Sequence, residues 1–270
     1  MSTLADDRPS TPSPETLFSR VLVGVDGSPE SSEAVRQAAI LAKPGEALTI
    51  LAAWSPAPPV VTPMATLPTY DAEEEAARSE AEDVVQAAQQ LLPSARTIVV
   101  RDLAAHALVG EIERTSSTLV VVGSHGQART VGILTGSTAT QLLHDAPCSV
   151  LLARRMRDVP RRIAVGVDGS PESAAAYAVA RQLAERFDGD LTVVVAEGGK
   201  RVDVAGVSLI VGDGFSVIPD EPVQVLVAAS ADVDLLVLGS RGLHGVKSLG
   251  SVSERVAHRA ECSTLVVRTS

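Results

Sequence analysis

The sequence predicts an α/β protein with two tandem domains, each an open, doubly wound sheet of mostly parallel strands with flanking helices. Two observations lead to this prediction. The segment RVLVGVDGSPESSE at 20–33 returns as RIAVGVDGSPESAA at 162–175, so the chain contains two copies of one unit. Within each copy, Val-rich runs alternate with helical patterns, which is typical of βαβ crossovers in a parallel sheet.

The repeat continues in the same order through both copies. VVVGSHG at 120–126 corresponds to LVLGSRG at 236–242, and HDAPCSVLLAR at 144–154 corresponds to HRAECSTLVVR at 258–268. A solenoid would repeat with a much shorter period, so these matches indicate a duplicated domain. The second copy is shorter in its middle and again in its glycine-rich loop.

We expect a disordered tail at 1–18, a first domain at 19–155, a linker at 156–161 and a second domain at 162–270. The tail is rich in Ser, Thr, Pro and acidic residues, as is typical of disordered segments, and it lacks the basic and apolar regions of a secretory signal. Residues 197–221, in the middle of the second domain, show no long helical pattern. We therefore expect this domain to lack one helix.

Local signals place the elements. A continuous Val-rich run such as 21–25 is typical of a parallel strand covered on both faces, and the Ser-Pro-Glu triplets at 28–30 and 170–172 predict helix starts. The first domain is expected to have strands at 21–25, 48–53, 97–100, 118–122 and 149–153 and helices at 29–42, 72–92, 104–115 and 137–144. The second domain is expected to have a helix from Pro171 and strands at 163–167, 191–196, 234–238 and 264–268.

Composition limits the classes of partner. The formal charge of −10 argues against binding long polyanions, and the 2% aromatic content argues against a base-stacking surface for single-stranded nucleic acid. No apolar run reaches 18 residues, so no membrane span is expected. Cys148 and Cys262 have no metal-ligand spacing and fit a reduced protein as buried apolar residues. We therefore expect a cytoplasmic protein that binds neither nucleic acid nor membranes.

The stretch GSHGQARTVGILTGS at 123–137 follows an expected buried strand and contains four glycines. It matches neither GxxxxGK[ST] nor GxGxxG, the best-known phosphate-binding patterns, and it is longer than the roughly 2–6 residues of most βα connections. It ends with Gly136 and Ser137 at a helix start, where free N–H groups and the helix dipole favour an anion. These features indicate a phosphate-binding loop rather than a flexible turn.

Ligands of an open parallel sheet bind beyond the carboxyl ends of its strands. In the first domain Gly24, Val25 and Asp26 follow the first strand there, Ala53 follows the second, and Gly123 follows the fourth. The Asp26 carboxylate can accept hydrogen bonds from a base or a ribose hydroxyl, or it can form a turn before a glycine. Together these positions suggest a nucleotide that lies across the strand ends.

At these residues the chain resembles the tandem universal stress proteins, and the resemblance covers essentially everything after residue 18. Nucleotide-binding members of this family carry G-x2-G-x9-G-[ST], which Gly123, Gly126, Gly136 and Ser137 match in spacing. The segments VGVDGSPES and PCSVLLAR add to the resemblance. It implies five-stranded, adenine nucleotide alpha hydrolase-like domains and a regulatory or stress-response role without a settled reaction.

The resemblance also implies a ligand, ATP or a related adenine nucleotide, which Mg²⁺ can accompany. It places the adenine beside Gly24, Val25, Asp26 and Ala53. It places the ribose and phosphates beside Gly123, Ser124, His125, Gly126, Gly136, Ser137 and Thr138. It further implies self-association through the last strands, 149–153 and 264–268, between the two halves or in a homodimer.

The second domain departs from this pattern. Gly239 and Gly242 keep the first spacing, but only seven residues, LHGVKSL, separate Gly242 from Gly250 and Ser251. Two residues fewer must reshape the loop or move the helix start. The positions kept at the adenine end are Gly166, Asp168 and Ala196. We therefore expect binding mainly in the first domain.

Residues suited to catalysis are scarce. Phosphoryl transfer normally needs a positioned cation at the phosphates, and the first loop contains neither Lys nor acid, only Arg129. No catalytic or metal-ligating residue is assigned. His144 and His258 are expected at the C-terminal ends of helices, where an imidazole interacts favourably with the helix dipole. Two alternatives to a nucleotide-binding regulator stay open: a slow ATPase or other nucleotide-processing enzyme, and an interaction protein that binds no nucleotide.

Overall fold

The computed structural model has five strands in each half of the described chain, and all but the two-residue strand Val217–Ile218 fall at places that the sequence predicts. The structure describes residues 17–42, 45, 47–55, 70–124, 136–197, 203–212, 215–240 and 251–269. The first half contains β1 (Arg20–Val25), β2 (Ala47–Trp54), β3 (Arg96–Arg101), β4 (Leu119–Gly123) and β5 (Ser149–Ala153). The second half contains β6 (Arg162–Gly166), β7 (Asp190–Ala196), β8 (Val217–Ile218), β9 (Leu235–Gly239) and β10 (Ser263–Val267).

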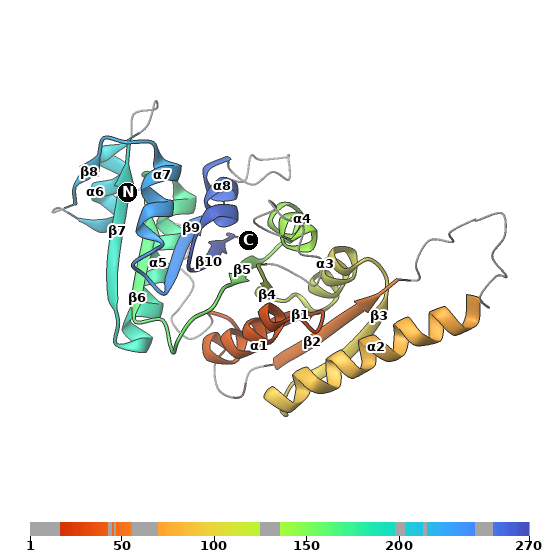
Figure 1. The fold of residues 1–270 in the computed structure, drawn as a ribbon. Helices are drawn as coiled ribbons and strands as arrows, with labels where there is room; N and C mark the ends of the chain where they lie inside the picture. The colour runs from red at the N-terminus through yellow and green to blue at the C-terminus, as the bar shows by residue number, and fades with distance from the viewer. Residues whose placement is uncertain are drawn as a thin grey trace, which may run out of the picture.

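Helices cover both faces of the sheet (Figure 1). Those of the first half are α1 (Pro29–Leu41), α2 (Tyr70–Leu91), α3 (Ala104–Thr115) and α4 (Ser137–Asp145). Those of the second half are α5 (Pro171–Phe187), α6 (Val204–Val211), α7 (Pro222–Ala229) and α8 (Ser251–Arg259). The expected elements agree with these bounds within the usual uncertainty of element ends, which confirms the α/β class. None of the described helices is long and apolar enough to cross a membrane.

One sheet of ten strands runs through both halves in the order β3-β2-β1-β4-β5-β10-β9-β6-β7-β8. Its neighbouring strands are parallel except at the centre, where β5 and β10 pair antiparallel with Leu151 opposite Leu265. The last strands of the two halves therefore pair within the chain. Because β4 and β9 occupy their other edges, neither β5 nor β10 has an edge left for a second chain.

The middle of the second half corrects one expectation. A helix was expected to be absent there, but α6 occupies the place of α2 in shortened form, with eight residues instead of 22. Its sequence, VAGVSLIV, has no polar face, so it lacks the 3.6-residue periodicity that marks a surface helix. The local start signal is Asp203, whose side chain accepts a hydrogen bond from the Gly206 amide at 3.1 Å.

The first helix of each half begins in the same way. Ser28 Oγ accepts a hydrogen bond from the Ser31 amide at 3.1 Å, and Ser170 Oγ accepts one from the Ser173 amide at 3.2 Å. Each capping serine precedes a proline at the first helical position, where its missing N–H costs nothing. The predicted starts of both helices are confirmed, and they fix the turn that follows β1 and β6.

The core is distributed unequally between the two faces of the sheet. On one face a single apolar cluster runs through both halves beneath α1, α2, α5 and α6 and includes the fully buried Val23 and Val237. On the other face, α3 and α4 pack on one cluster and α7 and α8 pack on another. The first turns of α3 and α4, on this second face, lie next to a cavity at the strand ends.

Arginine side chains from each half donate hydrogen bonds to carbonyls at the C-terminal ends of helices in the other half. Arg186 of α5 donates to the carbonyls of the last turn of α1, at 2.7 Å to Leu41 O. Arg268, after β10, donates to Leu143 O of α4 at 2.5 Å, and Arg154, after β5, donates to Ala257 O of α8 at 2.7 Å. Cations at helix C-termini are favoured by the orphan carbonyls and the helix dipole. These contacts join the two halves beyond the shared sheet.

Candidate functional site

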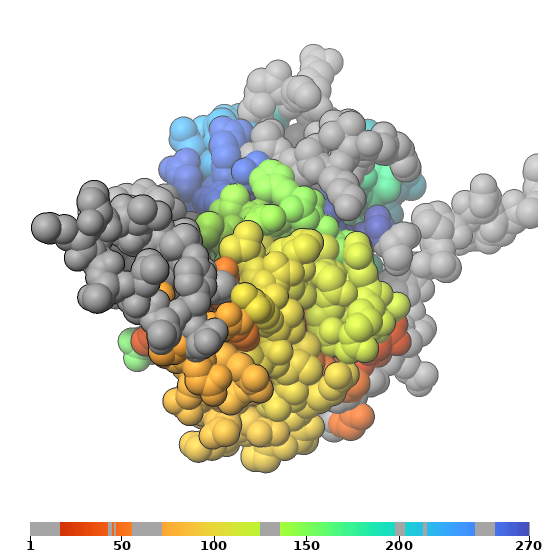
Figure 2. All heavy atoms as spheres, turned by 90° about the vertical axis from the view of Figure 1, so that its right-hand side faces the viewer, coloured from red at the N-terminus to blue at the C-terminus, as the bar shows by residue number. Residues whose placement is uncertain are grey.

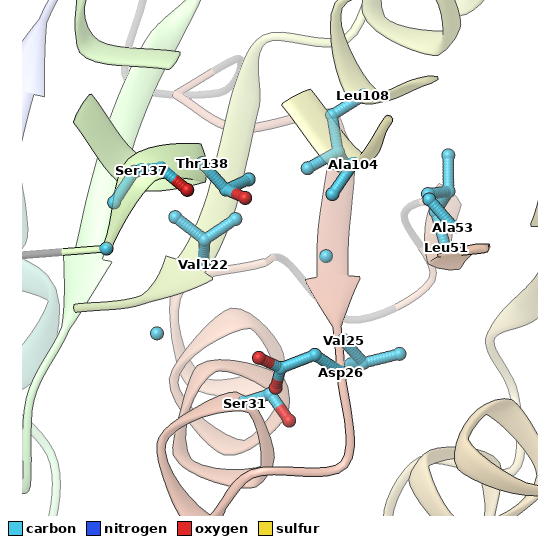
Figure 3. Close-up of a pocket in the computed structure, with 14 residues that line it drawn as sticks. Val25, Asp26, Ser31, Leu51, Ala53, Ala104, Leu108, Val122, Ser137 and Thr138 are labelled. Carbon is cyan, nitrogen blue, oxygen red and sulfur yellow. The ribbon is translucent and has the colours of Figure 1, made fainter. Parts of the chain in front are cut away.

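A cavity of about 310 Å³ opens at the carboxyl ends of β1, β2 and β4, next to the first turns of α3 and α4 (Figure 3). This volume is at the lower end of the range for small-molecule sites. In Figure 3, Ser137 and Thr138 lie on one side of the cavity, and Leu51 and Ala53 lie on the other. The cavity therefore has a polar end at α4 and an apolar end at β2 and α3.

The structure brings most of the predicted residues of the first half together around this cavity. Those that line it are Gly24, Val25, Asp26, Ala53, Gly123, Gly136, Ser137 and Thr138. Ser124 does not line it: its amide donates to Ala153 O at 3.0 Å, and its carbonyl accepts from the Gly136 amide at 2.9 Å, so it ties the two ends of the loop together. His125 and Gly126 lie outside the described residues.

The sequence did not reveal nearly half of the residues that line the cavity. The lining residues that it did not name are Ser31, Leu51, Ala104, Leu108, Val122 and Ala139. Two of them could have been found from strand register, because Leu51 pairs with Gly24 and Val122 precedes Gly123. Ala104 and Leu108 depend on how α3 packs over the sheet, which no local pattern reveals.

The apolar end is built around a glycine. A Cβ at Gly24 would lie 2.9 Å from Leu108 Cδ1 and 3.0 Å from Val122 Cγ1. Because carbon atoms do not approach so closely, the absence of a side chain lets α3 pack directly on the end of β1. The result is a smooth aliphatic wall of Leu51, Leu108 and Val122, with the small Ala53 at its margin.

The polar end is the N-terminus of α4. Gly136 occupies its N-cap position in an extended conformation (φ −66°, ψ 155°) and has no side chain with which to cap the helix. The serine-capped α1 and α5 differ from α4 in this respect. The N–H groups of the first turn thus remain as donors at the cavity, together with the hydroxyls of Ser137 and Thr138.

Asp26 forms the turn that the sequence offered as one of its two roles, and it also lies at the cavity. Its Oδ1 accepts hydrogen bonds from the Ser28 amide at 3.0 Å and from Ser28 Oγ at 2.6 Å, which is a turn-forming arrangement. Asp26 also lines the cavity, where Figure 3 shows it beside Ser31. The buried Ser31 hydroxyl in turn donates to Ser28 O at 2.9 Å. The carboxylate is therefore held in place by its own turn.

Charge is sparse around the cavity. Among the described lining residues, Asp26 has the one ionisable side chain, and neither lysine nor arginine is present. An anion bound there would be held by N–H groups, hydroxyls and the dipole of α4 rather than by a cationic side chain.

The second half keeps the strand-end geometry. Gly166 and Gly239 end β6 and β9, and Ala196 ends β7. Asp168 Oδ1 accepts from the Ser170 amide at 3.1 Å and from Ser170 Oγ at 2.6 Å, as Asp26 does in the first half. Of the other predicted residues, Ser251 begins α8, and Gly242 and Gly250 lie outside the described residues.

The cysteines and the recurring histidines lie away from the cavity lining. Burial raises the pKa of Cys148 and of Cys262 to about 12, so both remain thiols, as expected of buried apolar residues. His144 and His258 lie in the last turns of α4 and α8, as predicted. Figure 2 shows α4 next to α8, and His144 Nε2 lies 3.1 Å from Glu254 Oε1 at this contact.

Comparison with known proteins identifies the family. Residues 17–154 and 216–268, more than half of the chain, match the model of the universal stress protein family. The chain belongs to this family. Universal stress proteins of Mycolicibacterium smegmatis (strain ATCC 700084 / mc(2)155) and Mycobacterium tuberculosis (strain ATCC 25618 / H37Rv) are each 29% identical to it. The matches cover 92% and 93% of this chain, respectively, and 96% of each relative.

The fold of this universal stress protein is shared by solved structures. The crystal structure of a universal stress protein from Archaeoglobus fulgidus DSM 4304 aligns with a TM-score of 0.68 and 20% identity, over 94% of this chain and 98% of that chain. The predicted family and the tandem α/β architecture are thus confirmed, because the matches extend across both halves.

Proposed function

We propose that the first half of this universal stress protein binds one ATP or related adenine nucleotide and that the protein acts in the cytoplasm as a nucleotide-dependent regulator. The observation that supports this proposal most directly is the N-terminus of α4, whose N-cap is Gly136, opening on an apolar cavity at the strand ends. A helix N-terminus favours phosphate, and an aliphatic wall favours a flat base.

The base would lie at the apolar end. Leu51 and Leu108 provide an aliphatic surface there, and the small Ala53 and Ala104 leave room for a planar ring. Asp26 lies between this end and α4 in Figure 3, so a ribose would lie within reach of its carboxylate. Hydroxyl groups donate well to an ionised carboxylate. The two hydrogen bonds that Ser28 donates to Asp26 Oδ1 fix the orientation of this carboxylate.

The phosphates would lie at α4. The first-turn N–H groups and the hydroxyls of Ser137 and Thr138 supply the donors, and the helix dipole adds to the attraction. The described lining offers a single carboxylate, Asp26, so Mg²⁺ would be held mainly by phosphate oxygens and water, as is common for this ion. Its contribution would be to neutralise phosphate charge where no cationic side chain does so.

Binding rather than turnover suits this set of residues. General acid–base catalysis needs a positioned group that titrates near neutral pH, and the described lining contains no histidine, lysine or second carboxylate. Slow hydrolysis remains the alternative, and a phosphate-release assay with Mg²⁺ distinguishes it from binding alone.

The Gly136→Asp variant tests the proposal. Aspartate is a favourable N-cap, and the extended backbone at this position accepts it, so the helix should be at least as stable as before. Its charge would face the phosphates, and we expect ATP affinity to fall at least about 100-fold. The fluorescence of Trp54, the single tryptophan of the chain, reports binding because it follows Ala53 at the end of β2.

The matched control is Gly136→Asn, which has the same shape without the charge. We expect it to weaken ATP binding far less than Gly136→Asp does. Calorimetric titration and thermal unfolding of the three proteins complete the test. Equal ATP affinity in wild type and Gly136→Asp, with both folded, would contradict the placement of phosphate at α4.

A further inference from the structure

The second half contains the counterpart of the apolar wall. A Cβ at Gly166 would lie 3.1 Å from Leu226 Cδ2 and 3.1 Å from Leu238 Cδ2, much as Gly24 meets Leu108 and Val122. Leu226 of α7 thus stands where Leu108 of α3 stands. An apolar floor of the same construction is therefore present in both halves.

One difference is a hydrogen bond between two walls. In the first half Gly123 and Ala139 both line the cavity, one from β4 and one from α4. The corresponding residues of the second half are Gly239 and Ser253, and Ser253 Oγ donates to Gly239 O at 2.7 Å. Ser253 is a buried residue, with 8% of its surface exposed. It ties the first turn of α8 to the end of β9, whereas Ala139 has no hydroxyl with which to make the same bond in the first half.

The other difference is an ion pair between two helix starts. Arg255 Nη2 of α8 lies 3.3 Å from Glu221 Oε1, and Glu221 is the N-cap of α7. The first half has the uncharged Leu103 and Gln141 at the matching positions. Glu221 also accepts from the Gln224 amide at 3.3 Å, so its carboxylate is fixed to α7. The pair therefore joins α7 to α8 through charges that α3 and α4 lack at the matching positions.

We propose that Ser253, Glu221 and Arg255 form a latch that closes a second nucleoside-sized cleft over Gly166 and Leu226. Breaking the latch exposes that cleft to an adenosine-like ligand. The choice of ligand rests on the function proposed for the first half, but the latch itself does not. An exposed ion pair contributes little and is screened by salt, whereas a buried hydroxyl bond contributes more. Ser253 is therefore the stronger part of the latch.

Hydrogen exchange tests the latch without any ligand. The variant Ser253→Ala/Glu221→Leu/Arg255→Gln gives the second half the residues of the first. We expect the hydrogen-bonded amides in the second turns of α7 and α8 to exchange about tenfold faster, while those of α3 and α4 stay unchanged. Ser253→Ala alone should give most of this increase. Unchanged exchange in α7 and α8 of the triple variant would overturn the latch.

Adenosine tests the cleft, because it needs no phosphate loop. In native mass spectrometry over a range of adenosine concentrations, a second adenosine should bind the triple variant at about tenfold lower concentration than it binds the wild type. Equal affinity of the second adenosine in the two proteins would overturn the latch, and no second adenosine on the triple variant would overturn the second cleft. If the function proposed for the first half is wrong, the wild type binds none, and hydrogen exchange still decides the latch.

The reciprocal variant transfers the latch to the first half. Ala139→Ser/Leu103→Glu/Gln141→Arg introduces the second-half residues around the open cavity. We expect ATP affinity to fall about tenfold while the hydrogen exchange of α3 and α4 slows. Unchanged affinity together with unchanged exchange would show that these three positions do not control the opening, and would overturn the proposal.

Discussion

At the end of β4 the first half has Ala139 next to an open cavity, whereas at the end of β9 the second half has Ser253 bonded to Gly239. The strand ends of the two halves are otherwise closely alike, down to the hydrogen bonds that Asp26 and Asp168 accept. If the proposed latch holds, the framework of a duplicated site has persisted while a few side chains at its opening decide whether a ligand can enter.

The joint between the halves shows a different kind of symmetry. Arg154 donates to α8 and Arg268 donates to α4, so each half completes a helix of the other. Here the two copies kept the same residue type for the same purpose. We infer that residue types at the contact between the halves and at the strand ends are constrained in both halves. Residue types at the cleft openings are free to differ.

The largest expected effect concerns two matching glycines at the strand ends. A Cβ at Gly239 would lie 2.6 Å from the carbonyl oxygen of Glu172, and one at Gly123 would lie 2.9 Å from the carbonyl carbon of Glu30. Backbone atoms cannot move aside as side chains can, so Gly239→Ala should lower the free energy of unfolding by about 3 kcal/mol and Gly123→Ala by about 2 kcal/mol. Urea unfolding measures both, and a smaller loss for Gly239→Ala would contradict this order.

The interface arginines come next. Arg154→Ala and Arg268→Ala should each lower the free energy of unfolding by about 1.5–3 kcal/mol, because a buried carbonyl loses a charged donor. The loss should be smaller for Arg268→Ala, since Arg268 Nε is buried without a hydrogen-bond partner among the described residues. Thermal unfolding of the two variants tests this order, and equal losses would show that the unpaired nitrogen does not matter.

A third pair of variants distinguishes ligand binding from stability. The added Cβ would collide with equivalent side chains in Gly24→Ala and Gly166→Ala. Both substitutions should therefore lower the free energy of unfolding by about 1–2 kcal/mol. Only Gly24→Ala displaces the wall of the open cavity, and it alone should weaken ATP binding, by about tenfold. Calorimetric titration provides the measurement. A comparable loss of affinity in Gly166→Ala would place nucleotide in the second half.

The smallest expected effect depends on pH. Burial by itself raises the pKa of Asp234, but hydrogen bonds from the Arg162 side chain and from the amides of Arg161 and Arg162 lower it below its usual value. A lowered folded-state pKa contributes stability above the unfolded pKa, and that stability is lost as the pH falls through the folded value.

The first half has Thr118 at the position of Asp234. Asp234→Thr should therefore destabilise the protein slightly at pH 7 and make no difference once the carboxylate of the wild type is protonated. Urea unfolding of both proteins at pH 7 and at successively lower pH checks this, and the difference should shrink as the pH falls. A difference that stays constant as the pH falls would contradict the role of the ionised carboxylate.

The sequence was sufficient where a local signal decides the structure. The serine caps at Ser28 and Ser170, the helix start at Gly136 and the described strands other than β8 all follow from short patterns. Strand-end residues such as Asp26 and Ala53 could be placed because parallel strands bring their carboxyl ends to one edge.

Long-range packing accounts for what was missed. Leu108 and Ala104 line the cavity because α3 lies on the end of β1, and helix α6 is stabilised by burial of Val207 rather than by a polar face. The contact between Ser253 and Gly239 joins residues from different elements. No pattern within a single element encodes these contacts.

The number of nucleotides bound to the wild-type chain tests the central claim most directly. Calorimetric titration with ATP and Mg²⁺ gives this number, and Gly136→Asp shows which half is responsible. We predict one ATP per chain and none in Gly136→Asp. Two ATP per chain, or one that persists in folded Gly136→Asp, would contradict the claim that the first half alone binds.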